Sequence, residues 1–88
     1  MKIKDGYVLR QVAGNWVVLP VGQASVDFNG MVNLNDSGAL LWRALEKGCD
    51  LQALADVLLS EYDVDSNTAL SDAEEFISVL RGVGCIEE

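Results

Sequence analysis

Histidine is absent from this 88-residue chain, and cysteine occurs only twice. Without histidine the chain lacks the most common general base and the most common metal ligand of proteins. Cys49 and Cys85 do not form a CxxC pair, so their spacing does not match a zinc site. No glycine-rich phosphate loop is present either. Catalysis therefore has little chemical support, and we expect no cofactor, no metal and no enzymatic activity.

Positive charge is also scarce. Six Lys and Arg residues stand against fourteen Asp and Glu residues, which gives a net charge of -8. Such a surface repels the phosphates of nucleic acids and of anionic lipids, whereas it suits a peptide or a basic partner. We therefore expect neither nucleic acid nor a membrane as the partner.

Long apolar runs are missing as well. No run approaches the roughly 18 residues that a membrane-spanning helix needs, and residues 1–6 turn polar before the core of a secretion signal could form. We expect a cytoplasmic protein, in which Cys49 and Cys85 stay reduced as free thiols. Half of the residues are apolar, which is enough for one compact core in a single domain over residues 1–88.

The first 34 residues have the alternation and the β-branched bias of strands. We predict a hairpin from strands over residues 7–12 and 16–19. Pro20 has no amide to donate, so it should lie at a strand edge, a bulge or a strand end. The Asn29-Gly30 turn signal then precedes a short last strand over residues 31–34. The pattern predicts a three-stranded antiparallel meander.

After residue 34 the apolar period changes from two to about 3.6, which indicates helices. A first helix is predicted over residues 36–47, with Gly48 at its end. Asp50 can cap a second helix that ends near Tyr62. Both helices carry an apolar stripe for a shared core.

A third helix is capped by Asp65 or Ser66 and stopped by Gly82 or Gly84. Its predicted buried stripe is Ala69, Ala73, Phe76, Ile77 and Leu80. Residues 85–86 should return as a short packed tail. Strands followed by helices in the order βββααα predict an α+β fold, in which three helices cover a small antiparallel sheet.

Ser37 follows an aspartate at a helix start, a setting similar to the phosphopantetheine serine of an acyl carrier. A carrier needs a long helix before that serine, however, and strands precede it here. The alternative is a helix cap, in which Asn35 and Asp36 accept hydrogen bonds from the first amides and Ser37 fills the first turn. We favour the cap.

The bulky and ionisable side chains mostly fit structural roles. We expect Trp16 and Trp42 to pack in the core or at its edge, and Cys49 to be unreactive. Three carboxylates, of Asp72, Glu74 and Glu75, fall near the start of the third helix, where the helix dipole favours an exposed acidic face. Their second possible use is to steer a peptide that carries Lys or Arg.

The last strand of the meander forms an open edge without a lysine to block pairing. Val32 and Leu34 lie on one of its faces and Met31 on the other. An apolar edge of this kind can accept an extended peptide as an additional strand, while the adjacent helix supplies side-chain pockets.

Several pieces of sequence together resemble the PqqD family of coenzyme PQQ synthesis protein D, whose members share the RiPP recognition element fold. The pieces are FNGMVNLNDSGALLW over residues 28–42, LEKG over 45–48, the segment from Leu54 to Val64, and Asp72, Phe76, Leu80 and Gly84 at helical spacing. The resemblance covers residues 28–86 and, more loosely, the two strands before them.

This resemblance implies a winged-helix-like domain of three strands and three helices. Family members are not enzymes: they bind the leader of a ribosomally made precursor peptide and present it to a modifying enzyme, often a radical SAM protein. The leader adds to the third strand and lies between that strand and the third helix. On this chain, the implied peptide-binding residues are Phe28, Asn29, Gly30, Met31, Val32, Asn33 and Leu34 on the strand, and Leu70, Ala73, Glu74 and Ile77 on the helix.

Other functions stay open at this point. A winged-helix fold could bind DNA, but the third helix has only Arg81 against three carboxylates, which disfavours it. A domain of this fold could also serve another protein partner, such as a kinase or a transporter, or use Ser37 as a carrier. We expect a monomer or a weak homodimer.

Overall fold

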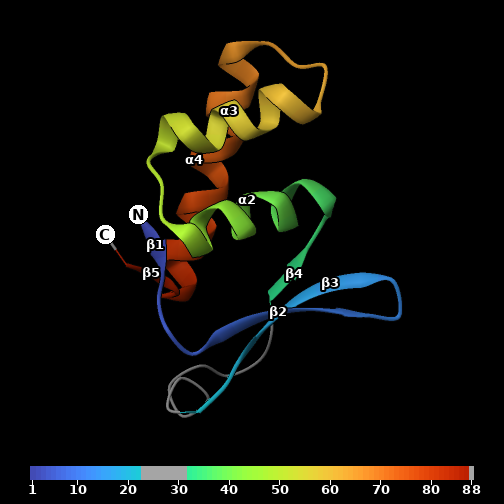
Figure 1. The fold of residues 1–88 in the computed structure, drawn as a ribbon, viewed down its shortest axis with the longest axis vertical. Coiled ribbons are helices and arrows are strands. Elements are labelled where there is room, and N and C mark those ends of the chain that lie inside the picture. Colours follow the sequence, from blue (N-terminus) through green and yellow to red (C-terminus); the bar gives the residue numbers. More distant parts are fainter. Residues whose placement is uncertain (23–31, 88) are drawn as a thin grey trace.

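The computed structural model describes residues 1–22 and 32–87. Three antiparallel strands form the main sheet: β2 (Tyr7–Val12), β3 (Asn15–Pro20) and β4 (Val32–Leu34), in the order β2-β3-β4. Three helices follow: α2 (Asp36–Lys47), α3 (Leu51–Glu61) and α4 (Ser66–Val83). They gather on one side of the sheet (Figure 1). The predicted α+β class and the βββααα order are therefore confirmed.

The strands and the first helix begin and end close to where the sequence places them. β2 and α2 have the predicted bounds, and Pro20 is the last residue of β3, as expected for a residue without an amide proton. β4 is described from Val32 onward. The turn signal Asn29-Gly30 and Met31 lie outside the described residues.

Each helix begins with an Asn or Asp side chain that accepts a hydrogen bond from the amide three residues later. Asn35 Oδ1 accepts from the Gly38 amide at 2.8 Å, Asp50 Oδ1 accepts from Ala53 at 2.8 Å, and Asp65 Oδ1 accepts from Thr68 at 2.7 Å. Asp65, and not Ser66, is thus the third cap. These bonds satisfy amides that a helix start leaves without an internal partner.

A second, two-stranded sheet joins the beginning and the end of the described chain. β1 (Lys2–Ile3) pairs antiparallel with β5 (Ile86–Glu87), and Ile3 lies opposite Ile86. β5 is the packed tail predicted after the third helix. β1 was not predicted, because a two-residue strand shows no periodicity and forms only when its partner is in place.

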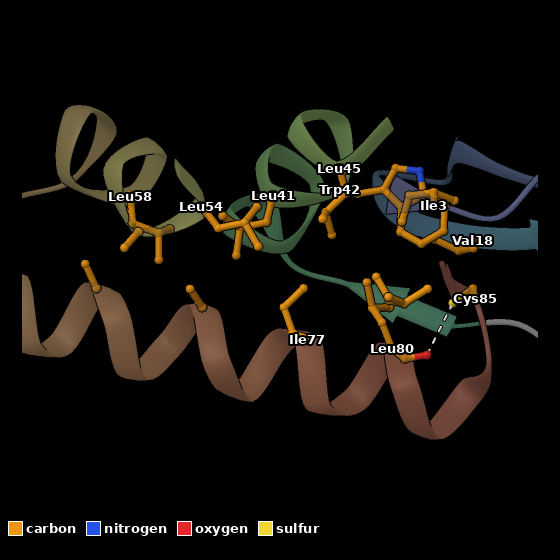
Figure 2. Close-up of a cluster of buried hydrophobic side chains, with 14 residues drawn as sticks. Ile3, Val18, Leu41, Trp42, Leu45, Leu54, Leu58, Ile77, Leu80 and Cys85 are labelled. Atoms are coloured by element: carbon orange, nitrogen blue, oxygen red, sulfur yellow. Dashed lines mark hydrogen bonds between the residues drawn. The ribbon is translucent and has the colours of Figure 1, made fainter. Parts of the chain in front are cut away.

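The core lies between the helices and the inner face of the sheet. Leu41, Leu54 and Leu58 project toward α4, which contributes Ile77 and Leu80 (Figure 2). At the sheet end of the same core, Trp42 is fully buried, as predicted, near Val18 and Ile3. Since β3, α2, α3 and α4 all contribute to this cluster, their relative positions are set by one continuous apolar contact.

The predicted stripe of the third helix is confirmed in four of its five positions. Ala69, Ala73, Ile77 and Leu80 are buried, whereas Phe76 is only half-buried at the edge of the cluster. No helix within residues 1–22 and 32–87 has the length and apolar character to cross a membrane.

Candidate functional site

A groove of about 600 Å³ opens between β4, the start of α2 and α4. Its lining comes from four parts of the chain: Val32, Asn33, Leu34 and Asn35 from β4 and the turn after it; Ser37, Gly38 and Leu41 from α2; Leu58, Tyr62 and Val64 from α3 and its end; and Asp72, Glu75, Phe76 and Val79 from α4. A volume of this size lies in the range of ligand-binding sites, about 300–1,000 Å³.

One wall of the groove is a single face of α4. At about 100° per residue, Phe76 lies next to the buried stripe, Asp72 and Val79 lie about 40–60° further round, and Glu75 lies outermost. The exposure agrees with this order: Phe76 is half-buried, the two carboxylates are exposed and Val79 is 51% exposed. This face of α4 therefore gives the groove an apolar floor at Phe76 and an acidic rim at Asp72 and Glu75.

The opposite wall is the edge strand β4. In register, Trp16 pairs with Leu34, Val17 with Asn33 and Val18 with Val32. The strand order places β4 at one edge of the sheet, where it pairs with β3 along one of its two sides. Val32 and Leu34 pack on the border of the core, while Asn33 is exposed. Within the described residues, the free side of β4 faces no other strand.

The structure brings only some of the sequence-predicted site residues to this groove. Val32, Asn33 and Leu34 line it, and Phe28, Asn29, Gly30 and Met31 lie outside the described residues. On the helix, none of the four predicted residues lines the groove: Ala73 and Ile77 are 0% and 3% exposed in the core, Leu70 packs against the core, and Glu74 is exposed elsewhere on α4.

The α4 residues that do line the groove belong to the neighbouring helical face. Sequence reasoning placed Asp72 and Glu75 on a solvated acidic face, which is confirmed by their exposure, but it did not place them beside the last strand. A signal was present: Val79 is an apolar residue three positions after Phe76 and outside the core stripe. Tyr62, which is 39% exposed, also lines the groove and was not predicted to do so.

Trp16 of β3 contacts two residues of α2. Its Nε1 donates a hydrogen bond to Asp36 Oδ1 at 3.2 Å, and the Arg43 guanidinium lies 4.9 Å from the centre of its ring. A cation at this distance is attracted by the face of the indole. Trp16 is half-buried and connects the sheet to α2, but it is not among the side chains that pack against the core.

Ser37 takes part in the helix cap. Its Oγ donates a hydrogen bond to Asn35 Oδ1 at 3.0 Å, the same oxygen that accepts from the Gly38 amide. This arrangement is the capping role that the sequence favours over a carrier serine.

The chain offers little nucleophilic chemistry at the groove. Cys49 and Cys85 are both free thiols, as predicted, and neither lines the groove. Burial raises the pKa of both thiols, so they are mostly protonated near neutral pH. Among residues 1–22 and 32–87, no three His, Cys, Asp or Glu side chains are grouped to hold a metal ion.

A small α+β domain with an open sheet edge beside an apolar groove is the class that this geometry defines. Residues 15–86 match the family of coenzyme PQQ synthesis protein D (PqqD), and the chain belongs to that family. The resemblance seen in the sequence is thereby confirmed. Among curated proteins no match is found.

Two solved structures share the fold over nearly the whole chain. TbiB1 in complex with the TbiA(beta) leader peptide is 26% identical, with a TM-score of 0.78, and the match covers 99% of this chain and 95% of that one. Lasso peptide synthetase B1 complexed with the leader peptide is 23% identical, with a TM-score of 0.76, covering 99% and 96%.

Proposed function

We propose that this protein is a non-catalytic domain that binds the leader of a ribosomally made precursor peptide by adding the leader as a strand to β4. The observation that carries the proposal is the position of the open β4 edge directly beside the groove. Membership of the PqqD family and the two similar structures, each a complex with a leader peptide, support it.

The two walls have different physical tasks in this function. The β4 backbone forms hydrogen bonds with any extended peptide, so it contributes affinity that depends little on sequence. Apolar side chains at alternate positions of the leader then enter the groove, where Phe76, Val79 and Leu34 provide contacts that do depend on sequence.

The expected affinity is moderate. A leader that is disordered when free must be ordered on binding, and this cost opposes the gain from strand pairing and apolar burial. A dissociation constant around one micromolar corresponds to about -8 kcal/mol. Binding of this strength holds the precursor during modification and still permits release.

In this proposal the domain acts together with a peptide-modifying enzyme, such as a radical SAM enzyme, in the cytoplasm. The bound leader leaves the core segment of the precursor free to reach that enzyme. The domain spans residues 1–88 and works as a monomer or a weak homodimer.

Amide chemical-shift mapping tests the binding mode. The isotope-labelled protein is titrated with the leader of the precursor peptide encoded beside its gene. Strand addition predicts that residues 32–34 and the α4 positions Asp72, Glu75, Phe76 and Val79 shift most. Shifts confined to β2 or to the outer side of α3 would contradict the proposed mode.

A pair of valine variants adds a quantitative check. Val79 is 51% exposed in the groove wall and Val12 is 55% exposed at the end of β2, away from the groove. Val79→Ser should weaken leader binding about fivefold to tenfold, because a valine that becomes buried contributes roughly 1–1.5 kcal/mol. Val12→Ser, the matched control, should bind as the wild type does; equal affinities for all three proteins would argue against the groove.

A further inference from the structure

We propose, on the basis of the proposed function, that the groove selects leaders with a Lys or Arg two residues away from an apolar anchor. The anchor enters the apolar floor at Phe76, and the basic side chain reaches the rim carboxylates of Asp72 and Glu75. The occupant is thus one class of peptide, an extended segment with a basic and an apolar side chain on the same face.

The distribution of charge around the groove carries the first step. The chain has six cationic side chains, and all six lie outside the lining: Lys2, Lys4, Arg10, Arg43, Lys47 and Arg81. The lining instead holds two carboxylates, of Asp72 and Glu75. A site with only negative charge favours a positive partner and disfavours an acidic one.

The carboxylates are also available for such a partner. In the described part of the chain, neither the Asp72 carboxylate nor the Glu75 carboxylate forms an ion pair or a hydrogen bond. Both are exposed at the rim, so a basic side chain can reach them without being fully desolvated. They lie beside apolar surface from Phe76 and Val79, along which the long stem of a Lys or Arg can pack.

Helix and strand dimensions set the spacing. Asp72 and Phe76 are four residues apart, which is about 6 Å along a helix axis. An extended peptide rises about 3.3–3.4 Å per residue, and residues two apart project to the same face. For a leader that lies along the axis of α4, a basic residue opposite Asp72 therefore places the residue two positions away opposite Phe76. This match fixes the register of the leader on β4.

Charge-neutral variants of the protein and of the peptide test the inference together. The probe is the leader of the precursor peptide encoded beside this gene, and a second copy has the Lys or Arg two residues away from the apolar anchor replaced by Gln. The double variant Asp72→Asn with Glu75→Gln removes the rim charge without changing side-chain size. Glu74→Gln is the matched control, since Glu74 lies about 160° around the helix from Asp72 and does not line the groove.

Binding is measured by fluorescence anisotropy at low and high salt, about 0.05 and 0.5 M, because exposed charges are screened by salt. The double variant of the protein and the Gln-substituted peptide should each weaken binding about threefold to tenfold at low salt. Combining the two should weaken binding no further, since each removes the same interaction. Glu74→Gln should bind as the wild type does at both salt concentrations.

The outcomes separate this inference from the function on which it rests. A leader that shifts the groove residues and binds the double variant as tightly as the wild type overturns the charge selection alone. A leader that binds in the groove but has no Lys or Arg at the stated spacing also overturns the charge selection alone. A leader that does not bind the wild type at all overturns the proposed function and this inference with it.

Discussion

Gly38 lies directly against the ring of Phe76. A Cβ added to Gly38 would stand 3.3 Å from Phe76 Cε1, 3.3 Å from Leu34 Cβ and 3.1 Å from Asn35 Oδ1. These distances are shorter than ordinary van der Waals contact, so a Cβ at position 38 would require these neighbours to shift by a few tenths of an ångström. The floor of the groove depends on this close contact between Gly38 and Phe76.

Replacing this glycine should be unfavourable. Alanine is a better helix former than glycine by up to about 1 kcal/mol, but at position 38 the added methyl group meets three neighbours. We expect Gly38→Ala to lower the free energy of unfolding by about 1 kcal/mol in urea titrations and to displace Phe76. Displacement is read from the Phe76 ring resonances.

Gly82 of α4 is the matched control. It is also helical, and a Cβ there would have nothing within 4 Å. Gly82→Ala should therefore raise the free energy of unfolding by about 0.5–1 kcal/mol. If both variants gain stability, the close contact between Gly38 and Phe76 is not a constraint.

The cap of α2 should depend mainly on Asn35. Its Oδ1 accepts from the Gly38 amide and from the Ser37 hydroxyl. Asn35→Ala removes the acceptor for a backbone amide and should cost about 1–2 kcal/mol of stability, whereas Ser37→Ala should cost at most about 1 kcal/mol. Thermal unfolding followed by circular dichroism measures both, and a larger loss for Ser37→Ala would contradict the assigned cap.

Trp42 carries a buried donor that finds no acceptor among the described residues. Its Nε1 has no hydrogen-bond partner in the part of the chain that the structure describes, and the side chain is 0% exposed. Trp42→Phe removes this donor together with some apolar contact, so the two effects oppose each other. We expect a change of less than about 1.5 kcal/mol in the free energy of unfolding.

Leu45 provides the comparison, since it is also 0% exposed. Leu45→Ala leaves a cavity and removes no unpaired group, so it should cost about 2–5 kcal/mol. A Trp42→Phe variant as unstable as Leu45→Ala would contradict this expectation, because lost packing or a lost hydrogen bond would then outweigh removal of the unpaired donor.

The cap of α4 should make stability depend on acidity. The Thr68 backbone amide, which donates to Asp65, lowers the pKa of that carboxyl below its usual value. A carboxyl with a lower pKa in the folded state stabilises the fold above its unfolded pKa, and this stabilisation is lost as the pH falls through the folded pKa. Wild-type stability should thus decline below about pH 4.

Asp65→Asn isolates this contribution. Asparagine caps a helix about as well as aspartate but does not titrate. In urea unfolding at a series of pH values, the decline below about pH 4 should be shallower for Asp65→Asn than for the wild type. Parallel curves for the two proteins would assign the acid sensitivity to other carboxylates.

Local chemistry explains why so many elements could be predicted. Asn35, Asp50 and Asp65 each stand directly before the first residue of a helix, and the capping bond involves residues only three apart. Gly84 has the left-handed conformation, φ 89°, that ends α4. Such signals act within one turn, so they can be read without knowing the rest of the fold.

The groove could be predicted only in part, because it joins residues that are distant in the chain. Val32, Asn33 and Leu34 follow from the edge strand, but the face of α4 beside them did not. Ala73 and Phe76 are both apolar and both fit a helical stripe, and only the packing of α2 and α3 on α4 shows that Ala73 is buried and that Phe76 borders the groove.

The amino-acid sequence by itself thus determines the order of strands and helices, their caps and the acidic surface, since these depend on neighbouring residues and on composition. The tertiary structure alone decided which side of α4 faces β4, and therefore that Asp72 and Glu75 stand above an apolar floor. The physical reason is that a helix has several faces of similar composition, and its orientation depends on the best packing of the whole core, not on any local pattern.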